Sequence, residues 1–298
     1  MKQIALIGAT ASGKSALAVE LALRYNCQIL SLDSLSVYRE IDIASAKPSK
    51  NELSLVKHYG IDEIYPNEHF SAALFFDIYK KAKYECEQSD KNLIIVGGTG
   101  FYLYALTNGL SNLPAISNEA LKTAGDELLD KKAAFDKLSL LDPEYAVKIA
   151  PNDSYRIQKA FEIYYQTGEI PTKVFKSTNK EPLCPSIPIF EILFDRNELR
   201  EKIKFRTQKM FAEGLVDEVK KLENKYGREP KSMKSIGIVE ILDFLDGKIT
   251  SKESEELITI HTGQLAKRQE TFNRSKFANA VKDAPEKLKI LIGDFFDA

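Results

Sequence analysis

Short apolar runs alternate with segments of helical periodicity in the first third of the chain. Apolar runs at 3–8, 27–31 and 93–96 predict buried β-strands. A helix is predicted over 14–25, and another begins after Ser71, a typical N-cap. Strands that alternate with helices indicate a parallel sheet with helices on both faces. Ligands of such sheets bind beyond the carboxyl ends of the strands.

The pattern changes in the middle of the chain. Helical periodicity dominates over 112–185, where Asp153 can cap a helix with an apolar stripe, and no buried strand is predicted. An apolar run at 187–194 then predicts a further strand, and helices are predicted from there to the end. We therefore expect a core formed by 1–111 and 186–298, interrupted by a helical insertion.

Composition sets limits on the class of protein. The chain has 298 residues, of which 44% are hydrophobic and 29% charged, as in ordinary soluble proteins. No apolar run approaches the roughly 20 residues of a membrane span, and no signal peptide is recognised, so a cytoplasmic protein is expected. The three cysteines are isolated, which argues against a zinc site or a disulfide framework. With a net charge of −1, a nucleic-acid partner would have to be held by local basic patches.

Residues 8–15 read G-A-T-A-S-G-K-S and match the phosphate-loop pattern G-x-x-x-x-G-K-S. The motif lies between a predicted strand and a predicted helix, which is the context it requires. Backbone N–H groups of such a loop face an anion, and the helix N-terminus adds partial positive charge. Lys14 supplies an ammonium group and Ser15 a hydroxyl suited to Mg²⁺. A phosphorylated ligand is therefore predicted, with a plain glycine-rich turn as the alternative.

Two other strand ends carry candidate chemistry. Phosphate-loop hydrolases usually place an acidic residue after a second buried strand, to hold Mg²⁺. Here Gly97-Gly98-Thr99 follows the strand instead, which suggests a loop that brings N–H groups and a hydroxyl to the ligand. A plain strand-to-helix turn is the alternative. Asp33, at the end of the second strand, could bind Mg²⁺, accept a proton, or cap a turn.

An arginine is predicted to project from a core-facing helix stripe. Leu199, Ile203, Arg206 and Met210 are spaced 4, 3 and 4 residues apart, so they share one face of a helix. A buried guanidinium needs an anionic partner, because an unpaired buried charge is costly. The partner of Arg206 is either a carboxylate or a diphosphate, which Arg can bind with two donors.

Basic residues also cluster at several places, with tyrosines and phenylalanines among them. Surfaces that stack nucleic-acid bases have this composition, although a solvated face is the ordinary interpretation of each cluster. The clusters are Arg156/Lys159, Lys173/Lys176, Arg228/Lys231/Lys234 and Lys267/Arg268/Arg274/Lys276.

The motifs form an ordered series along nearly the whole chain. They run G-A-T-A-S-G-K-S at 8–15, S-L-D-S at 31–34, D-I-A-S-A-K-P at 42–48, V-G-G-T-G-F-Y at 96–102, P-N-D-x-x-R at 151–156 and A-K-R-Q at 266–269. This series resembles the bacterial tRNA dimethylallyltransferase family. The phosphate loop alone is shared by many proteins, whereas the series in this order is specific.

The resemblance implies a P-loop NTPase-like α/β fold, a parallel sheet flanked by helices with an inserted helical domain that contacts tRNA. It also implies transfer of the dimethylallyl group of dimethylallyl diphosphate to the exocyclic amine of the adenine 3′ of the anticodon. In such a reaction Asp33 is the general base, and Thr99 and Arg206 bind the leaving diphosphate. The diphosphate-binding residues implied are Gly8, Thr10, Ala11, Ser12, Gly13, Lys14 and Ser15, the last also a ligand of Mg²⁺. The tRNA-binding residues implied are Asp33, Ser34, Leu35, Ser36, Tyr155, Arg156, Ile157, Gln158 and Lys159.

The expected partners are therefore tRNA and dimethylallyl diphosphate, with Mg²⁺ as cofactor, no membrane, and a monomeric chain. Two other functions use the same motifs. A small-molecule kinase would use the loop for ATP, but the missing acidic strand end and the helical insertion argue against it. A nucleotide-gated RNA-binding protein without catalysis would need neither Asp33 nor an inward-facing Arg206.

Overall fold

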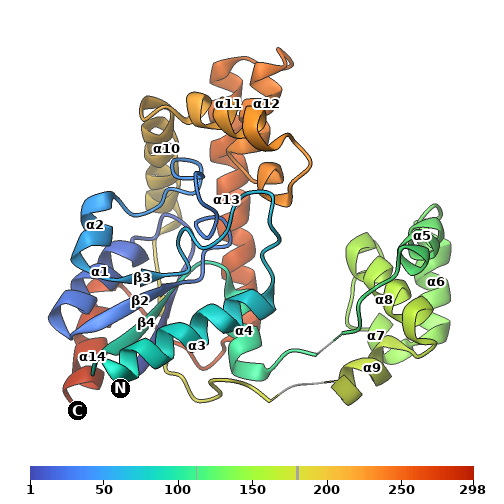
Figure 1. The fold of residues 1–298 in the computed structure, drawn as a ribbon, viewed down its shortest axis with the longest axis horizontal. Helices are drawn as coiled ribbons and strands as arrows, with labels where there is room; N and C mark the ends of the chain where they lie inside the picture. Colours follow the sequence, from blue (N-terminus) through green and yellow to red (C-terminus); the bar gives the residue numbers. More distant parts are fainter. Residues whose placement is uncertain (112, 179–180) are drawn as a thin grey trace. The chain divides into compact units, whose positions relative to one another are not determined.

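The computed structural model describes residues 1–111, 113–178 and 181–298. The chain divides into two compact units (Figure 1). Unit 1 comprises Met1–Ala105 and Ser186–Ala298, and unit 2 comprises Leu106–Pro185. The start of the insertion expected from the sequence, residue 112, lies outside the described residues.

Unit 1 is built on a six-stranded parallel sheet in the order β3-β2-β4-β1-β5-β6. The predicted fold class, a parallel α/β sheet flanked by helices, is confirmed. The strands are β1 (Gln3–Ile7), β2 (Cys27–Ser31), β3 (His58–Tyr59), β4 (Asn92–Gly97), β5 (Ile189–Ile192) and β6 (Val281–Asp283).

Helices cover both faces of this sheet (Figure 1). Because side chains alternate along a strand, Ile4 and Leu6 of β1 point to one face, where they form a core with α1 and α14. The opposite face is covered by α3, whose Phe75 is buried. The helices of unit 1 are α1 (Lys14–Arg24), α2 (Lys50–Leu55), α3 (Ala72–Gln88), α4 (Gly100–Asn108, shared with unit 2), α10 (Arg196–Ala212), α11 (Leu215–Tyr226), α12 (Ile238–Leu245), α13 (Ser251–Lys276) and α14 (Pro285–Asp297).

The expectation that only helices follow β5 is wrong, because β6 lies between α13 and α14. This three-residue strand reads Val-Lys-Asp, and its side chains are exposed or half-buried at the edge of the sheet. Its extended form comes from backbone pairing with β5, and no apolar run signals it.

Unit 2 is a helical unit consisting of α5 (Asn118–Glu127), α6 (Lys131–Leu141), α7 (Pro143–Ala146), α8 (Ser154–Thr167) and α9 (Pro171–Thr178). As predicted, α8 begins at the cap Asp153, whose carboxylate accepts the N–H of Arg156 at 3.1 Å. It ends at Gly168, which has φ +73°. Ile157 and Phe161 of α8 are fully buried in the apolar core of the unit.

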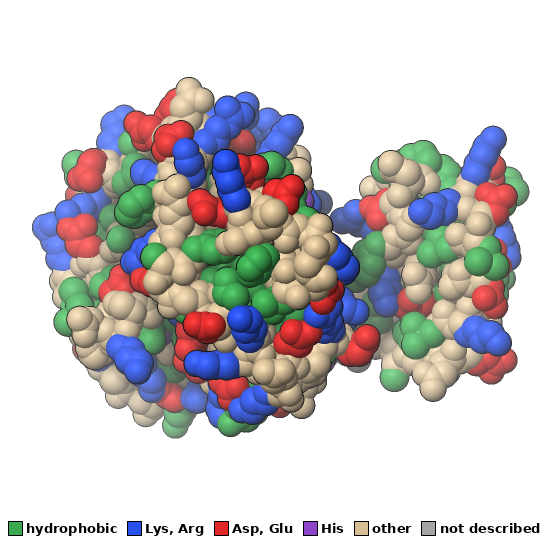
Figure 2. Space-filling model, turned by 90° about the horizontal axis from the view of Figure 1, so that it is seen from above, with side chains coloured by type: hydrophobic (Ala, Val, Ile, Leu, Met, Phe, Trp, Pro, Cys, Tyr) green, Lys and Arg blue, Asp and Glu red, His purple; other side chains and the backbone are tan. Residues whose placement is uncertain are grey.

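The surface of each unit carries charges of both signs. Figure 2 shows Lys and Arg side chains interspersed with Asp and Glu on the visible face of each unit. Across the residues that the structure describes, no helix combines the length and the apolar character needed to cross a membrane.

Candidate active site

The phosphate loop joins β1 to α1 at the carboxyl end of the sheet. A Cβ on Gly8 would lie only 2.9 Å from the Ser12 hydroxyl oxygen, and Gly13 has φ +89°, so both positions favour glycine. No side chain caps α1. Its first N–H groups therefore remain available to an anion.

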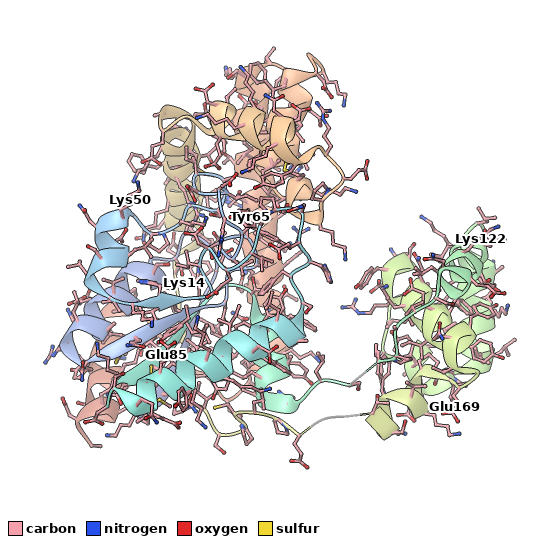
Figure 3. All side chains as sticks on the ribbon, viewed as in Figure 1. Lys14, Lys50, Tyr65, Glu85, Lys122 and Glu169 are labelled. Atoms are coloured by element: carbon pink, nitrogen blue, oxygen red, sulfur yellow. The ribbon has the colours of Figure 1, made fainter. Side chains whose placement is uncertain are left out.

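Lys14, labelled in Figure 3, begins α1, and its side chain is half-buried. Its Nζ donates to the Ala9 carbonyl oxygen at 3.0 Å. Burial lowers the pKa of Lys14 to about 8, an effect that nearby Asp33 opposes and nearby Arg206 reinforces. In the ligand-free protein, the attraction of Asp33 therefore does not make up for the solvent that the ammonium group has lost. A bound anion would stabilise its charged form.

Arg206 projects toward the loop from the predicted stripe of α10. The stripe is confirmed, because Leu199, Ile203 and Met210 are buried. Arg206 donates from Nη1 to the Thr10 hydroxyl at 3.2 Å and from Nη2 to the Ser45 carbonyl at 3.4 Å. Burial lowers its pKa, while Asp33 raises it. None of the carboxylates described forms an ion pair with this guanidinium, so the salt bridge that the sequence left open is not formed.

Asp33 follows β2, and its two carboxylate oxygens differ in role. Oδ1 accepts the N–H groups of Leu35 at 2.8 Å and Ser36 at 3.2 Å, so this oxygen caps the turn. For Oδ2, no hydrogen-bond partner is found in the described part of the chain. One oxygen therefore fixes the orientation of the carboxylate, and the other remains free to accept a proton.

These groups line one cavity of about 290 Å³ in unit 1. Its polar wall includes Thr10, Lys14, Asp33, Thr99 and Arg206, so the structure brings together the predicted catalytic residues and the phosphate loop. The rest of the wall mixes apolar and polar residues, and most of it comes from α10, α13 and the segment before α12. The apolar lining residues are Leu35, Ala44, Ile203, Met210, Ile236, Ile258 and Leu265. A smaller cavity of about 70 Å³ shares several of the polar residues and adds Ser15.

Packing requires the glycine that ends β4, Gly97, and the one that follows it, Gly98. A Cβ on Gly97 would lie 2.6 Å from the Leu32 Cβ, and one on Gly98 would overlap the amide of Gln269. Helix α13 and the end of β2 therefore approach this loop too closely for larger residues. Thr99 lines the cavity, as the ligand-loop interpretation requires, and no acidic residue stands at the end of β4.

The loop at 42–48 is held by buried charge. The Lys47 side chain is 5% exposed, and its Nζ donates to the Tyr38 carbonyl oxygen at 2.7 Å and to Asp42 and Asp62 at 2.7 and 2.6 Å. From α11, the Glu218 carboxylate accepts the three successive N–H groups of residues 42–44 at 2.8–3.0 Å. This bracing fixes the backbone whose next carbonyl binds Arg206.

The residues implied to bind tRNA fall in both units. In unit 1, Ser34 is exposed and Leu35 lines the cavity, whereas Ser36 is buried and its hydroxyl pairs with that of Ser31 at 3.2 Å. In unit 2, the implied residues begin α8. Tyr155 there is 71% exposed.

Further along α8, the side chain of Ile157 is fully buried and has no surface to offer. The prediction for unit 2 therefore reduces to Tyr155, Arg156, Gln158 and Lys159. Arg156 pairs with Asp153, and Lys159 pairs with Glu162 at 2.5 Å.

A comparison with models of protein families shows which family this chain belongs to. The model of the family described as IPP transferase matches residues 36–276. The chain belongs to the IPP transferase family. It is 53% identical over 289 residues to a "tRNA dimethylallyltransferase" of Nautilia profundicola, covering 97% of this chain and 98% of the relative. A protein of the same name from Aliarcobacter butzleri is 49% identical and covers 99% of both chains. The family predicted from the motifs is confirmed.

Solved IPP transferase structures share the fold. A tRNA isopentenylpyrophosphate transferase from Bacillus halodurans matches with a TM-score of 0.71 at 32% identity, covering 99% of this chain and 95% of that one. A eukaryotic dimethylallyltransferase described as acting on tRNA matches with a TM-score of 0.78 at 26% identity, covering 96% of this chain and 74% of that one.

The sequence analysis missed the contribution of α13 to the cavity. Ile258, Thr262, Leu265 and Gln269 are spaced 4, 3 and 4 residues apart and line the cavity from one helix face. The same spacing that singled out Arg206 on α10 was present here. Without a charged residue in the stripe, it could not be distinguished from ordinary core packing.

Proposed function

We propose that the chain transfers the dimethylallyl group of dimethylallyl diphosphate to the exocyclic amine of the adenine 3′ of the anticodon in tRNA. The predicted enzyme class, a tRNA prenyltransferase, is confirmed by the family and by relatives that match over nearly their whole length. The donor, the metal and the roles of individual residues are proposals that rest on the geometry of the site.

One observation carries this assignment. A single cavity combines a carboxylate with a free oxygen, two half-buried cations without ion-pair partners among the described residues, and apolar side chains in part of its wall. The cations of Lys14 and Arg206 suit a diphosphate, and the apolar wall suits a branched hydrocarbon. Asp33 then lies where an attacking amine could give up its proton.

The reaction balances with these groups alone. The carbon–oxygen bond between the dimethylallyl group and the diphosphate breaks, and a carbon–nitrogen bond to the adenine amine forms. The amine becomes acidic as it attacks, and its proton passes to Asp33 Oδ2. The electron pair of the broken bond leaves with the diphosphate, whose growing charge is stabilised by Lys14, Arg206, Thr99 and the loop N–H groups.

We propose Mg²⁺ as the cofactor, with Ser15 as its protein ligand. The described residues contain no cluster of three or more His, Cys, Asp or Glu that could hold a metal. The hydroxyl of Ser15 fits an ion that keeps water and diphosphate oxygens as its other ligands, because this residue is exposed in the first turn of α1 and lines the smaller cavity. When bound, the ion would neutralise charge on the diphosphate.

The acceptor adenine must leave its stack to reach a cavity inside unit 1. We propose that unit 2 assists by holding the tRNA, with the exposed ring of Tyr155 as a stacking surface. Lys159 Nζ lies 5.9 Å from the centre of this ring. We further propose that the chain acts as a monomer in the cytoplasm, where tRNA is modified.

The test is incubation with unmodified tRNA and labelled dimethylallyl diphosphate, with and without a chelator. Label is expected on the tRNA, released diphosphate is expected in equal amount, and the chelator is expected to abolish both. Labelled ATP serves as the control for the kinase alternative. Absence of label on the tRNA, or transfer of the γ-phosphate of ATP, would contradict the proposal.

A further inference from the structure

We infer that Gln269 is a positioning residue that locks the phosphate loop against the Gly98 loop and so sets the geometry of the diphosphate site. This rests on the proposed function, because the group to be positioned is the diphosphate. The carboxamide of Gln269 reaches both loops. Its Oε1 accepts the N–H of Thr10 at 2.8 Å, and its Nε2 lies only 2.4 Å from where a Cβ on Gly98 would be.

Thr10 is consequently held from two sides. Its backbone N–H is fixed by Gln269 on α13, and its hydroxyl accepts from Arg206 on α10. The next residue, Ala11, has φ +62°, a left-handed conformation that is unfavourable for alanine. A loop with such strain keeps its shape only when its surroundings hold it, and Gln269 supplies a bond from outside the loop.

The helix that carries Gln269 is itself firmly anchored. One face of α13 packs on this end of the sheet, with Ala266 buried against Ala9 and with Phe272 2.7 Å from where a Cβ on Gly100 would be. Asn273 donates to Glu191 of β5 at 3.1 Å. Gln269 therefore projects from a rigid support, as precise positioning requires.

The hydrogen bond and the packing of Gln269 can be separated by two variants. Gln269→Met keeps the length of the side chain but cannot accept the Thr10 N–H, whereas Gln269→Ala loses both. Both variants are expected to weaken binding of inorganic diphosphate with Mg²⁺ by about tenfold. Both should raise KM for dimethylallyl diphosphate and leave KM for tRNA unchanged. A Gln269→Met protein that binds diphosphate like the wild type would overturn the inference.

A double-mutant cycle tests the contact with Gly98. Gly98→Ala should displace Gln269 and weaken diphosphate binding in the wild-type background. It should have little further effect in Gln269→Ala, where the obstructing amide is gone. Gly100→Ala is the matched control, because its Cβ would contact Phe272 and not Gln269. Its effect on diphosphate binding should therefore be the same in the wild type and in Gln269→Ala. Additive effects of Gly98→Ala and Gln269→Ala would contradict the inference.

Two measurements keep this inference separate from the proposed function. Calorimetric binding of diphosphate needs no turnover, so a protein that responds to the Gln269 changes but never labels tRNA would refute only the function. Thermal unfolding of each sample shows whether a variant is folded. Gln269→Met, which keeps the packing volume, is the decisive variant because it is expected to unfold close to the wild-type temperature.

Discussion

The two cations beside the phosphate loop of unit 1 differ from the cations at the surface of unit 2. In the unit 1 site, Lys14 and Arg206 are half-buried and make no ion pair with any described carboxylate, and loss of solvent around them lowers the pKa of both. In unit 2, most cations lie at the surface and pair with a carboxylate. These pairs are Lys137–Glu127, Lys148–Glu144, Arg156–Asp153, Lys159–Glu162, Lys173–Glu169 and Lys176–Glu144.

The difference indicates that the unit 1 cations form a preformed anion site, whereas the surface cations of unit 2 can exchange their partners. Cations that lose much of their solvent without gaining a partner cost stability, so their presence in unit 1 indicates a ligand that supplies the missing charge. Exposed pairs contribute little and can exchange a carboxylate for a phosphate. The described exceptions in unit 2 are Lys122 (labelled in Figure 3), Lys131 and Lys132, for which no ion pair is found.

The largest expected effect separates chemistry from anion binding. Asp33→Asn keeps an acceptor for the N–H groups of Leu35 and Ser36 but removes the base. We expect turnover to fall by roughly 10²- to 10⁴-fold, the usual range for a general base. Diphosphate binding should not weaken, because a negative charge is removed near the anion. Single-turnover kinetics and calorimetric binding of diphosphate measure the two effects, and an equal loss in both would contradict the role of a base.

The next prediction tests whether Arg206 lacks a negatively charged partner in the ligand-free protein. Arg206→Met should raise the unfolding temperature of the ligand-free protein, because an unpaired buried charge is removed. It should also weaken diphosphate binding by roughly 10- to 100-fold, as expected for hydrogen bonds to a charged group. Thermal unfolding with and without diphosphate measures both changes. A variant destabilised without ligand would show that Arg206 is already compensated in the fold.

The pH dependence of diphosphate binding tests Lys14. Its pKa is lowered to about 8 in the free protein, and a bound anion should raise it, so binding takes up a proton above this pH. We expect constant affinity up to about pH 8 and then a fall of at most about tenfold per pH unit. Calorimetry from pH 7 to above pH 9, roughly one pH unit to each side of the Lys14 pKa, measures this dependence. Lys14→Met supplies the baseline for ionisation of the ligand, and an equal slope in this variant would refute the assignment.

The smallest expected effect concerns the paired cations of unit 2. Arg156→Ala should weaken tRNA binding a few-fold and reduce the salt slope by about 0.7 to 0.9 for the lost phosphate contact. Asp153→Asn keeps the α8 cap but frees the guanidinium, so it should strengthen tRNA binding. Filter binding over a salt series measures both. If both variants match the wild type, this end of α8 is outside the tRNA interface.

Lys159 is a less direct test of the same surface. Its partner Glu162 is only 2% exposed. Removing Lys159 would therefore leave a buried carboxylate without its cation, and the variant would lose stability as well as a possible phosphate contact.

The sequence predicted those features that depend on local patterns. The strands β1, β2 and β4, the cap and stop of α8, and the stripe that carries Arg206 follow from spacing over a few residues. By contrast, the edge strand β6 forms through its partner strand, and Gln269 meets Thr10 across 259 positions of sequence. No pattern of neighbouring residues in the sequence predicts the pairing of β6 with β5 or the hydrogen bond between Gln269 and Thr10.

Asp33 shows a different limit of sequence analysis. The sequence left a turn cap and an open carboxylate as alternatives, and in the structure one oxygen caps while the other is free. Likewise, Gly97 and Gly98 leave room for neighbouring side chains, and Thr99 faces the cavity. In both segments, the same few residues have a structural role and a chemical role. The spacing of residues in the sequence cannot show that both roles are present.

The pairing of β1 with β5 has a consequence for synthesis on the ribosome. Ala5 pairs with Ile189, which is translated roughly ten to forty seconds later at usual elongation rates. Unit 2 is a contiguous segment and can fold while the nascent chain is still growing. The donor site has to wait for Arg206 and then Gln269, so we expect a chain that stalls early to be unable to capture an isoprenoid.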